Sequence, residues 1–170
     1  MTPVRTLLLA SVALAAAGLS ACETTMAPGP AVAVFDATAF AWSTVPGDAA
    51  ISGQVAYAGG GQRWSCAGSV GLTPETPWTR QRFQTLYAST ERAAVPAAVV
   101  RARSVSDASA DYQTFVRSTT CDGAGRFSFD GLPAGSWFVI APVTLAGQDP
   151  VVLMRRVETR PGSGTTVTLD

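Results

Sequence analysis

The 170-residue sequence contains no histidine and no lysine. Histidine is the usual general base beside a serine or cysteine nucleophile, and lysine is its main substitute, so hydrolases of both types are excluded. The strings CxxC, HExxH and DxDxD, which place ligands for zinc or calcium, are also missing. We therefore expect a protein that is not an enzyme and that holds no metal ion or cofactor.

The sequence also lacks concentrated positive charge. Twelve basic residues, all of them arginine, balance twelve acidic residues, and the formal net charge is zero. A surface that binds DNA or RNA needs a patch or stripe of basic residues. We therefore expect no nucleic-acid partner.

Paired carboxylates are the remaining route to catalysis, because glycoside hydrolysis needs two of them beside a cleft. The glutamates beyond residue 34 are Glu75, Glu91 and Glu158, and they belong to unrelated segments. Asp122 and Asp130 lie beside glycine-containing turns, where aspartate is common without binding an ion. An unrecognised hydrolase is therefore the weakest alternative.

The amino-terminal segment is typical of a secretory signal. Arg5 is followed by an apolar run from Leu7 to Ala17 and then by small residues up to Cys22. A membrane-spanning helix needs about 20 apolar residues, so the alternative of an uncleaved anchor helix is disfavoured.

The four residues LSAC that end at Cys22 resemble the lipobox of bacterial lipoproteins. The resemblance implies a signal peptide of residues 1–21, a diacylglyceryl group on the Cys22 thiol and an acyl chain such as palmitate on the new amino terminus. Several acyl chains make a stable anchor in membrane lipid. Glu23 follows, where lipoproteins kept in the inner membrane typically have aspartate. The resemblance therefore implies the periplasmic face of the outer membrane.

Cys66 and Cys121 are the cysteines that remain once Cys22 is lipidated. Because a compartment outside the cytoplasm permits disulfides, we predict that these two form one bridge. The alternative is a pair of free buried thiols, since the pairing is inferred only from parity and compartment.

The rest of the chain divides into a tether and one domain. Residues 22–34 are rich in alanine, proline and glycine, which is typical of a flexible extended tether. Large apolar residues begin at Phe35, so we expect the domain to span residues 35–170. A domain of this size can bury a sizeable core.

Alternating apolar and polar residues between turns predict at least six strands. Thr76 and Pro77 have the types expected at a helix start, and a short helix is predicted over residues 77–90. The fold class is thus an all-β antiparallel sandwich with one inserted short helix and a long loop. The predicted strands are residues 51–57, 64–74, 112–120, 126–130, 136–143, 151–160 and 165–170.

The stretch GRFSFDGLPAGSWFVIAP, residues 125–142, resembles the carboxypeptidase regulatory-like domain, which has a prealbumin-like β-sandwich fold. The opening strands ISGQVAY and VGLTPET add to the resemblance, which spans about residues 49–169. The departure from the family pattern is an insertion over about residues 76–111. In the peptidases that name the family this domain is an accessory, so the resemblance implies no catalyst.

Candidate partner-binding residues lie in the insertion. Trp78, Phe83 and Tyr87 give the predicted helix an apolar side, and Arg80 and Arg82 lie among them. Aromatic residues and arginine are enriched where partners bind, and long connections are often functional. The alternative is that the helix buries its apolar side in its own domain and caps the sandwich.

Two functions compete on these observations. The first is a non-enzymatic structural or protein-interaction module of the cell envelope, with an envelope protein as partner; a broad apolar patch on the insertion would favour it. The second is a carbohydrate-binding lipoprotein with a glycan as ligand. Three coplanar exposed aromatic rings would favour the second, and Trp64, Trp78 and Trp137 are the candidates.

Overall fold

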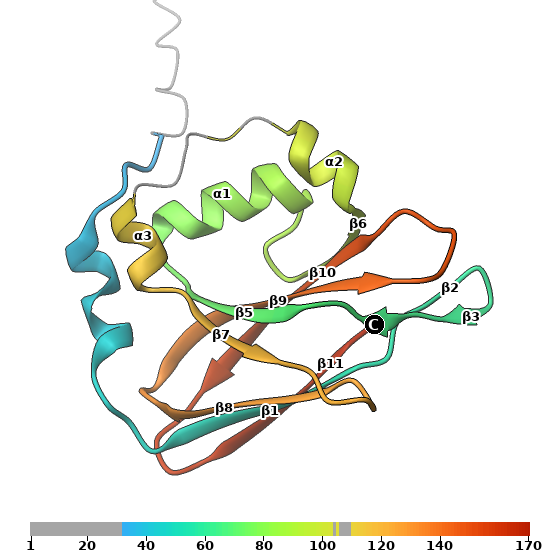
Figure 1. The fold of residues 1–170 in the computed structure, drawn as a ribbon. Coiled ribbons are helices and arrows are strands. Elements are labelled where there is room, and N and C mark those ends of the chain that lie inside the picture. Colours follow the sequence, from blue (N-terminus) through green and yellow to red (C-terminus); the bar gives the residue numbers. More distant parts are fainter. Residues whose placement is uncertain (1–31, 104, 106–109) are drawn as a thin grey trace, which may run out of the picture. The chain divides into compact units, whose positions relative to one another are not determined.

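The computed structural model describes residues 32–103, 105 and 110–170, and it shows two β-sheets packed face to face (Figure 1). The predicted all-β sandwich is therefore confirmed. Within these residues, no helix is long and apolar enough to cross a membrane. Cys22 and the signal peptide lie outside the described residues, so lipidation stays a prediction.

The smaller sheet has three strands in the order β11-β1-β8. Strand β1 pairs antiparallel with β8 but parallel with β11, which departs from the antiparallel pairing expected throughout. The cause is the topology, because β1 and β11 are the first and last strands of the domain and no short turn joins them and fixes an antiparallel direction. The bounds are β1 Ala49–Val55, β8 Arg126–Leu132 and β11 Gly164–Leu169.

The larger sheet follows the order β6-β10-β9-β5-β7, with the short strand β4 also paired to β9. All of its pairs are antiparallel. A small ribbon, β2 Ala58–Gly59 with β3 Gln62–Arg63, precedes it. The bounds are β4 Ser65–Cys66, β5 Ser69–Pro74, β6 Arg92–Pro96, β7 Arg117–Thr120, β9 Gly135–Thr144 and β10 Val151–Thr159.

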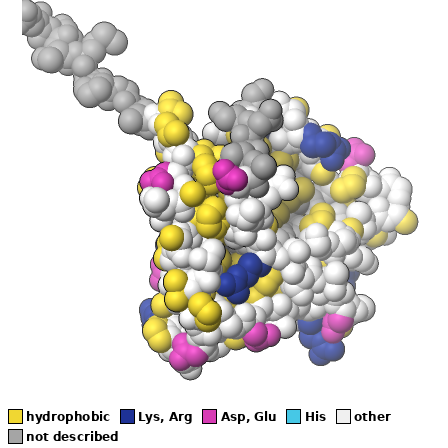
Figure 2. Space-filling model, turned by 60° about the vertical axis from the view of Figure 1, so that its left-hand side comes forward, with side chains coloured by type: hydrophobic (Ala, Val, Ile, Leu, Met, Phe, Trp, Pro, Cys, Tyr) yellow, Lys and Arg dark blue, Asp and Glu magenta, His cyan; other side chains and the backbone are white. Residues whose placement is uncertain are grey.

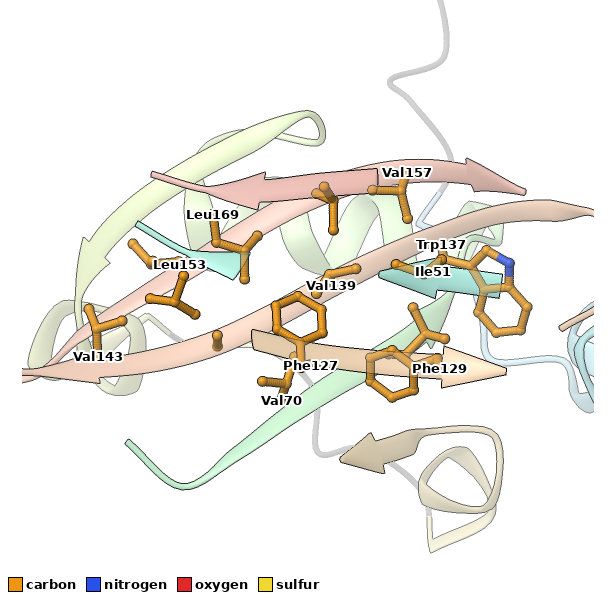
Figure 3. Packing of buried hydrophobic residues seen from close by; sticks show 14 of the residues in the cluster. Ile51, Val70, Phe127, Phe129, Trp137, Val139, Val143, Leu153, Val157 and Leu169 are labelled. Atoms are coloured by element: carbon orange, nitrogen blue, oxygen red, sulfur yellow. The ribbon is translucent and has the colours of Figure 1, made fainter. Parts of the chain in front are cut away.

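The core lies between the two sheets because alternate side chains of each strand point inward. Ile51, Phe127 and Phe129 of the smaller sheet face Trp137 and Val139 of the larger one (Figure 3). All five are buried. The alternation predicted from the sequence is therefore confirmed in these strands.

The insertion contributes more regular structure than a helix and a loop. Helix α1 spans Pro77–Tyr87 and is capped by Thr76. The side chain of Thr76 accepts a hydrogen bond from the backbone N–H of Thr79, and the side chain of Thr79 accepts one from the backbone N–H of Thr76. The helix ends before Ala88, which has a left-handed φ of 56°. Strand β6 and helix α2, Ala97–Ala102, follow.

A third helix, α3, spans Ala110–Thr114. The strand predicted over residues 112–120 therefore begins only at Arg117, and that part of the prediction is wrong. The sequence signal was ambiguous because a short apolar run fits a helix turn as well as a strand.

Cys66 in β4 and Cys121, directly after β7, form a disulfide with an S–S distance of 1.98 Å. The predicted pairing is confirmed. Both cysteines pack against the main core. The bridge links β4, which pairs with β9, to the point where the chain leaves β7 for β8.

The segment that enters the domain contacts the insertion. Ala33 donates its N–H to Oε1 of Gln81 in α1 at 2.7 Å, and Phe35 makes an edge contact with Trp78. A 3-10 helix, η1, then spans Ala37–Thr44. Its buried Phe40 packs against Phe115 and other aromatic rings.

Candidate functional site

Two of the candidate partner-binding residues are buried inside the domain. Phe83 and Tyr87 are only 3% and 8% exposed, and they form a cluster with Phe138 and Met154 on the outer face of the larger sheet. They present no surface to a partner, so the expectation is corrected for these two. Helix α1 buries its apolar side in its own domain, which was the alternative.

The other three candidates lie at the surface, but each has an intramolecular partner. Arg80 forms an ion pair with Glu75. The guanidinium carbon of Arg82 lies 5.3 Å from the ring centre of Trp78, within the range of a cation–π contact. Trp78 itself is half-buried and meets Tyr112 edge to face. A partner-binding role for these three stays a prediction.

The tryptophans do not form a platform for a sugar ring. Trp137 is fully buried and Trp64 is 9% exposed, so neither can stack on a ligand. The insertion does not carry a broad apolar patch either, since its one large exposed apolar residue among those described is Val99. On the face shown in Figure 2, charged side chains are scattered in small groups among neutral and apolar ones, and some groups place arginine beside an acidic residue.

Glu75, one of the candidate acids, is a structural ion-pair residue. Its side chain is 8% exposed, and its two oxygens accept hydrogen bonds from Arg80 and Arg156. Burial acts to lower the pKa of Arg156, but the hydrogen bond and charge of Glu75, with smaller contributions from Glu158 and Glu91, outweigh it and raise that pKa. Glu158 also pairs with Arg156. Across the described residues no acidic cluster able to hold a metal is found.

An open hollow of about 640 Å³ lies on the outer face of the smaller sheet. Its floor consists of two rows of polar side chains that the strand register places side by side across β11, β1 and β8. The first row is Thr166, Ser52 and Ser128; the second is Thr168, Gln54 and Arg126.

One wall of the hollow is formed by residues 119–122, at the end of β7 and in the connection to β8. The disulfide holds this wall in place because Cys121 is part of it. Beneath the floor, Gly53 leaves room for the ring of Phe127, which would lie 2.0 Å from a Cβ atom at that position. The hollow thus rests on a tightly packed part of the core.

Asp122 and Arg126 give the hollow its charged groups. Oδ2 of Asp122 accepts a hydrogen bond from Nε of Arg126 at 2.9 Å, and Oδ1 accepts from the backbone N–H groups of Ala124 and Arg126. These bonds, led by the backbone N–H of Arg126, hold the pKa of Asp122 below its usual value. Gln54 is directed toward the same turn, and its Nε2 lies 3.5 Å from the carbonyl of Ala124.

Sequence reasoning did not identify this hollow. It treated Asp122 as a turn residue, which is correct, but it assigned no role to Arg126 or to the polar rows. The period-two pattern does predict which residues of β1 and β8 face outward. This pattern does not predict that three strands distant in the sequence place these residues around one hollow.

Comparisons with known proteins inform the fold more than the function. No protein-family model matches the sequence, and no curated protein matches it. Among solved structures, the fold is similar to the crystal structure of a protein from Pseudomonas aeruginosa called a "putative carbohydrate binding protein". The TM-score is 0.59 at 20% sequence identity, and the match covers 82% of this chain and 99% of that chain. At this identity the similarity shows a shared fold.

Proposed function

We propose that this protein is a non-enzymatic carbohydrate-binding lipoprotein, with the hollow on the smaller sheet as its sugar site. The observation that carries the proposal is the lining of the hollow, where hydroxyl, amide and guanidinium groups stand in two adjacent rows. Sugars present many hydroxyl groups, and such side chains supply both hydrogen-bond donors and acceptors to them. The volume of the hollow lies within the usual range of ligand sites, roughly 300–1,000 Å³.

The similar solved structure adds support, because its name refers to carbohydrate binding and its fold is shared. The proposed mode of binding differs from the aromatic platform considered from the sequence. Since Trp64 and Trp137 are buried, recognition rests on hydrogen bonds and not on ring stacking. We expect weak binding of single sugars and better binding of short oligosaccharides, which extend along the strands.

The lipid anchor is the second part of the proposal. Acyl chains on Cys22 would hold the chain at the periplasmic face of the outer membrane, and residues 22–34 would act as the tether. The domain would then bind envelope glycan within reach of that tether. The resemblance to lipoproteins at residues 19–22 supports this part, and the resemblance to carboxypeptidase regulatory-like domains supports a binding role without catalysis.

A structural or protein-interaction module is the second candidate. Three large apolar residues flanking η1, Val32, Val34 and Val45, are 77%, 82% and 56% exposed. They lie before and after η1 and not on the insertion, where the sequence placed the partner surface. We rank this candidate below carbohydrate binding because these valines give no indication of what covers them.

The test is an NMR titration of the full chain in detergent with neutral and acidic oligosaccharides. Binding at the hollow should shift the amide signals of Gln54, Ser128 and Thr168 in a saturable way. The double variant Ser52→Ala with Ser128→Ala should weaken binding, because it removes two neighbouring hydroxyls from the floor.

Ser118→Ala is the matched control for that variant. Ser118 is an exposed serine of β7 outside the lining, so its loss should leave binding unchanged. If no saccharide shifts any signal of the smaller sheet, carbohydrate binding by this hollow is wrong.

A further inference from the structure

The hollow contains two charged side chains, and they differ in how many of their hydrogen-bonding groups are already used within the protein. Both oxygens of Asp122 accept hydrogen bonds from the turn and from Arg126, so this carboxylate is already hydrogen-bonded within the protein. The guanidinium of Arg126 uses only Nε, and its Nη1 and Nη2 groups make no hydrogen bond to any other described residue. The charged donors that remain for a ligand therefore belong to Arg126.

The bond to Asp122 also orients this guanidinium. Nε is the inner corner of the planar group, so holding it at 2.9 Å from Oδ2 leaves the outer fork of Nη1 and Nη2 open. The side chain is 70% exposed and lines the hollow beside Gln54 and Thr168. A planar fork of this kind matches an anionic oxygen group through two parallel hydrogen bonds.

We infer that the ligand of this hollow is an acidic saccharide, whose carboxylate or sulfate binds the outer fork of Arg126. The inference rests on the proposed function and names the class of sugar that the site prefers. The neutral hydroxyls of the same sugar then meet the two polar rows, with Ser52 and Ser128 beside Gln54. Asp122 acts as a positioning residue, because it reaches the ligand only through Arg126.

The experiment compares three probes on the full chain in detergent: a galacturonic acid trisaccharide, its neutral methyl ester and a sulfated galactose trisaccharide. The free acid should bind roughly tenfold more tightly than the ester, as expected for a charge-assisted pair. The sulfated probe separates the two acidic groups, since a strong preference for either one identifies which the fork accepts.

Two substitutions of Arg126 separate charge from geometry. Arg126→Gln should remove the preference for the acid over the ester while leaving binding of the ester nearly unchanged. Arg126→Lys keeps the charge but loses the fork, so it should retain only part of the preference. Arg92→Gln is the matched control, because Arg92 is an exposed arginine of β6 outside the hollow, and it should behave like the wild type.

The possible failures are distinguishable. If acid and ester bind the wild type equally, or if Arg126→Gln keeps the preference, the acidic ligand is wrong and carbohydrate binding stands. If no probe binds while circular dichroism shows a folded chain, the proposed function is wrong and the inference falls with it.

Discussion

The ring of Phe83 in α1 lies 4.5 Å, centre to centre, from the ring of Phe138 in β9. Phe138 points away from the main core, so this contact covers the outer face of the larger sheet. Tyr87 and Met154 complete the cluster. The insertion therefore closes a second, smaller core, and this role leaves the hollow on the opposite sheet as the better candidate for ligand binding.

Phe83→Ala tests the role of α1 as a cap. Loss of a fully buried aromatic side chain should lower the free energy of unfolding by about 3–5 kcal/mol, measured by urea titration. Gln84→Ala, on the exposed side of the same helix, should change it by less than about 0.5 kcal/mol. Similar losses for both variants would mean that α1 does not pack as described.

The Cys66–Cys121 bridge is expected to contribute strongly to stability. Replacing both cysteines by serine should lower the free energy of unfolding by about 4 kcal/mol in the chain-closure model. A reducing agent should lower the melting temperature of the wild type and leave that of the double variant unchanged. Two thiols that react freely with a maleimide in the folded, unreduced protein would contradict the bridge.

Tyr87 is expected to make the free energy of unfolding depend on pH in the alkaline range. Burial, with a smaller contribution from Tyr112, raises the pKa of Tyr87 to about 12. In the unfolded chain a tyrosine loses its proton near pH 10, so between pH 10 and 12 only the unfolded state ionises. The contribution of Tyr87 to the free energy of unfolding should therefore be complete below pH 10 and be lost as the pH rises from 10 to 12. The variant Tyr87→Phe should show a smaller decrease over this range. An identical decrease in both proteins would exclude Tyr87 as a source.

Cys22→Ala tests the lipid anchor. Because the thiol is the expected acyl acceptor, the variant should remain as the larger precursor and take up no labelled fatty acid in cells. Cys66→Ala is the control, since it removes a cysteine that is not expected to be lipidated. Fatty-acid labelling of the Cys22 variant would refute the lipobox assignment.

Several features of this protein are determined by short stretches of its sequence. The alternation of Ile51, Gly53 and Val55 places these residues on one face, because successive side chains of a strand point to opposite sides. The start of α1 at Thr76 and Pro77 depends on hydrogen bonds made within one turn. Local patterns of this kind were sufficient to predict the sandwich and the helix.

Other features depend on segments that are far apart in the sequence. The parallel pairing of β1 with β11 joins the two ends of the domain, and no pattern within either strand specifies the direction of its neighbour. The apolar side of α1 is equally compatible with a partner surface and with a cap. Phe138 and Met154 of the larger sheet, which lie far from α1 in the sequence, bury that side and make the helix a cap.

The hollow shows the same division between local and tertiary information. Strand alternation by itself determined that Ser52, Gln54, Arg126 and Ser128 face outward. Only the tertiary structure decided that they stand in adjacent rows beside residues 119–122, and that Asp122 leaves the fork of Arg126 open. The physical reason is that the direction of a side chain is a property of its own strand, whereas a site requires the packing and register that bring several strands together.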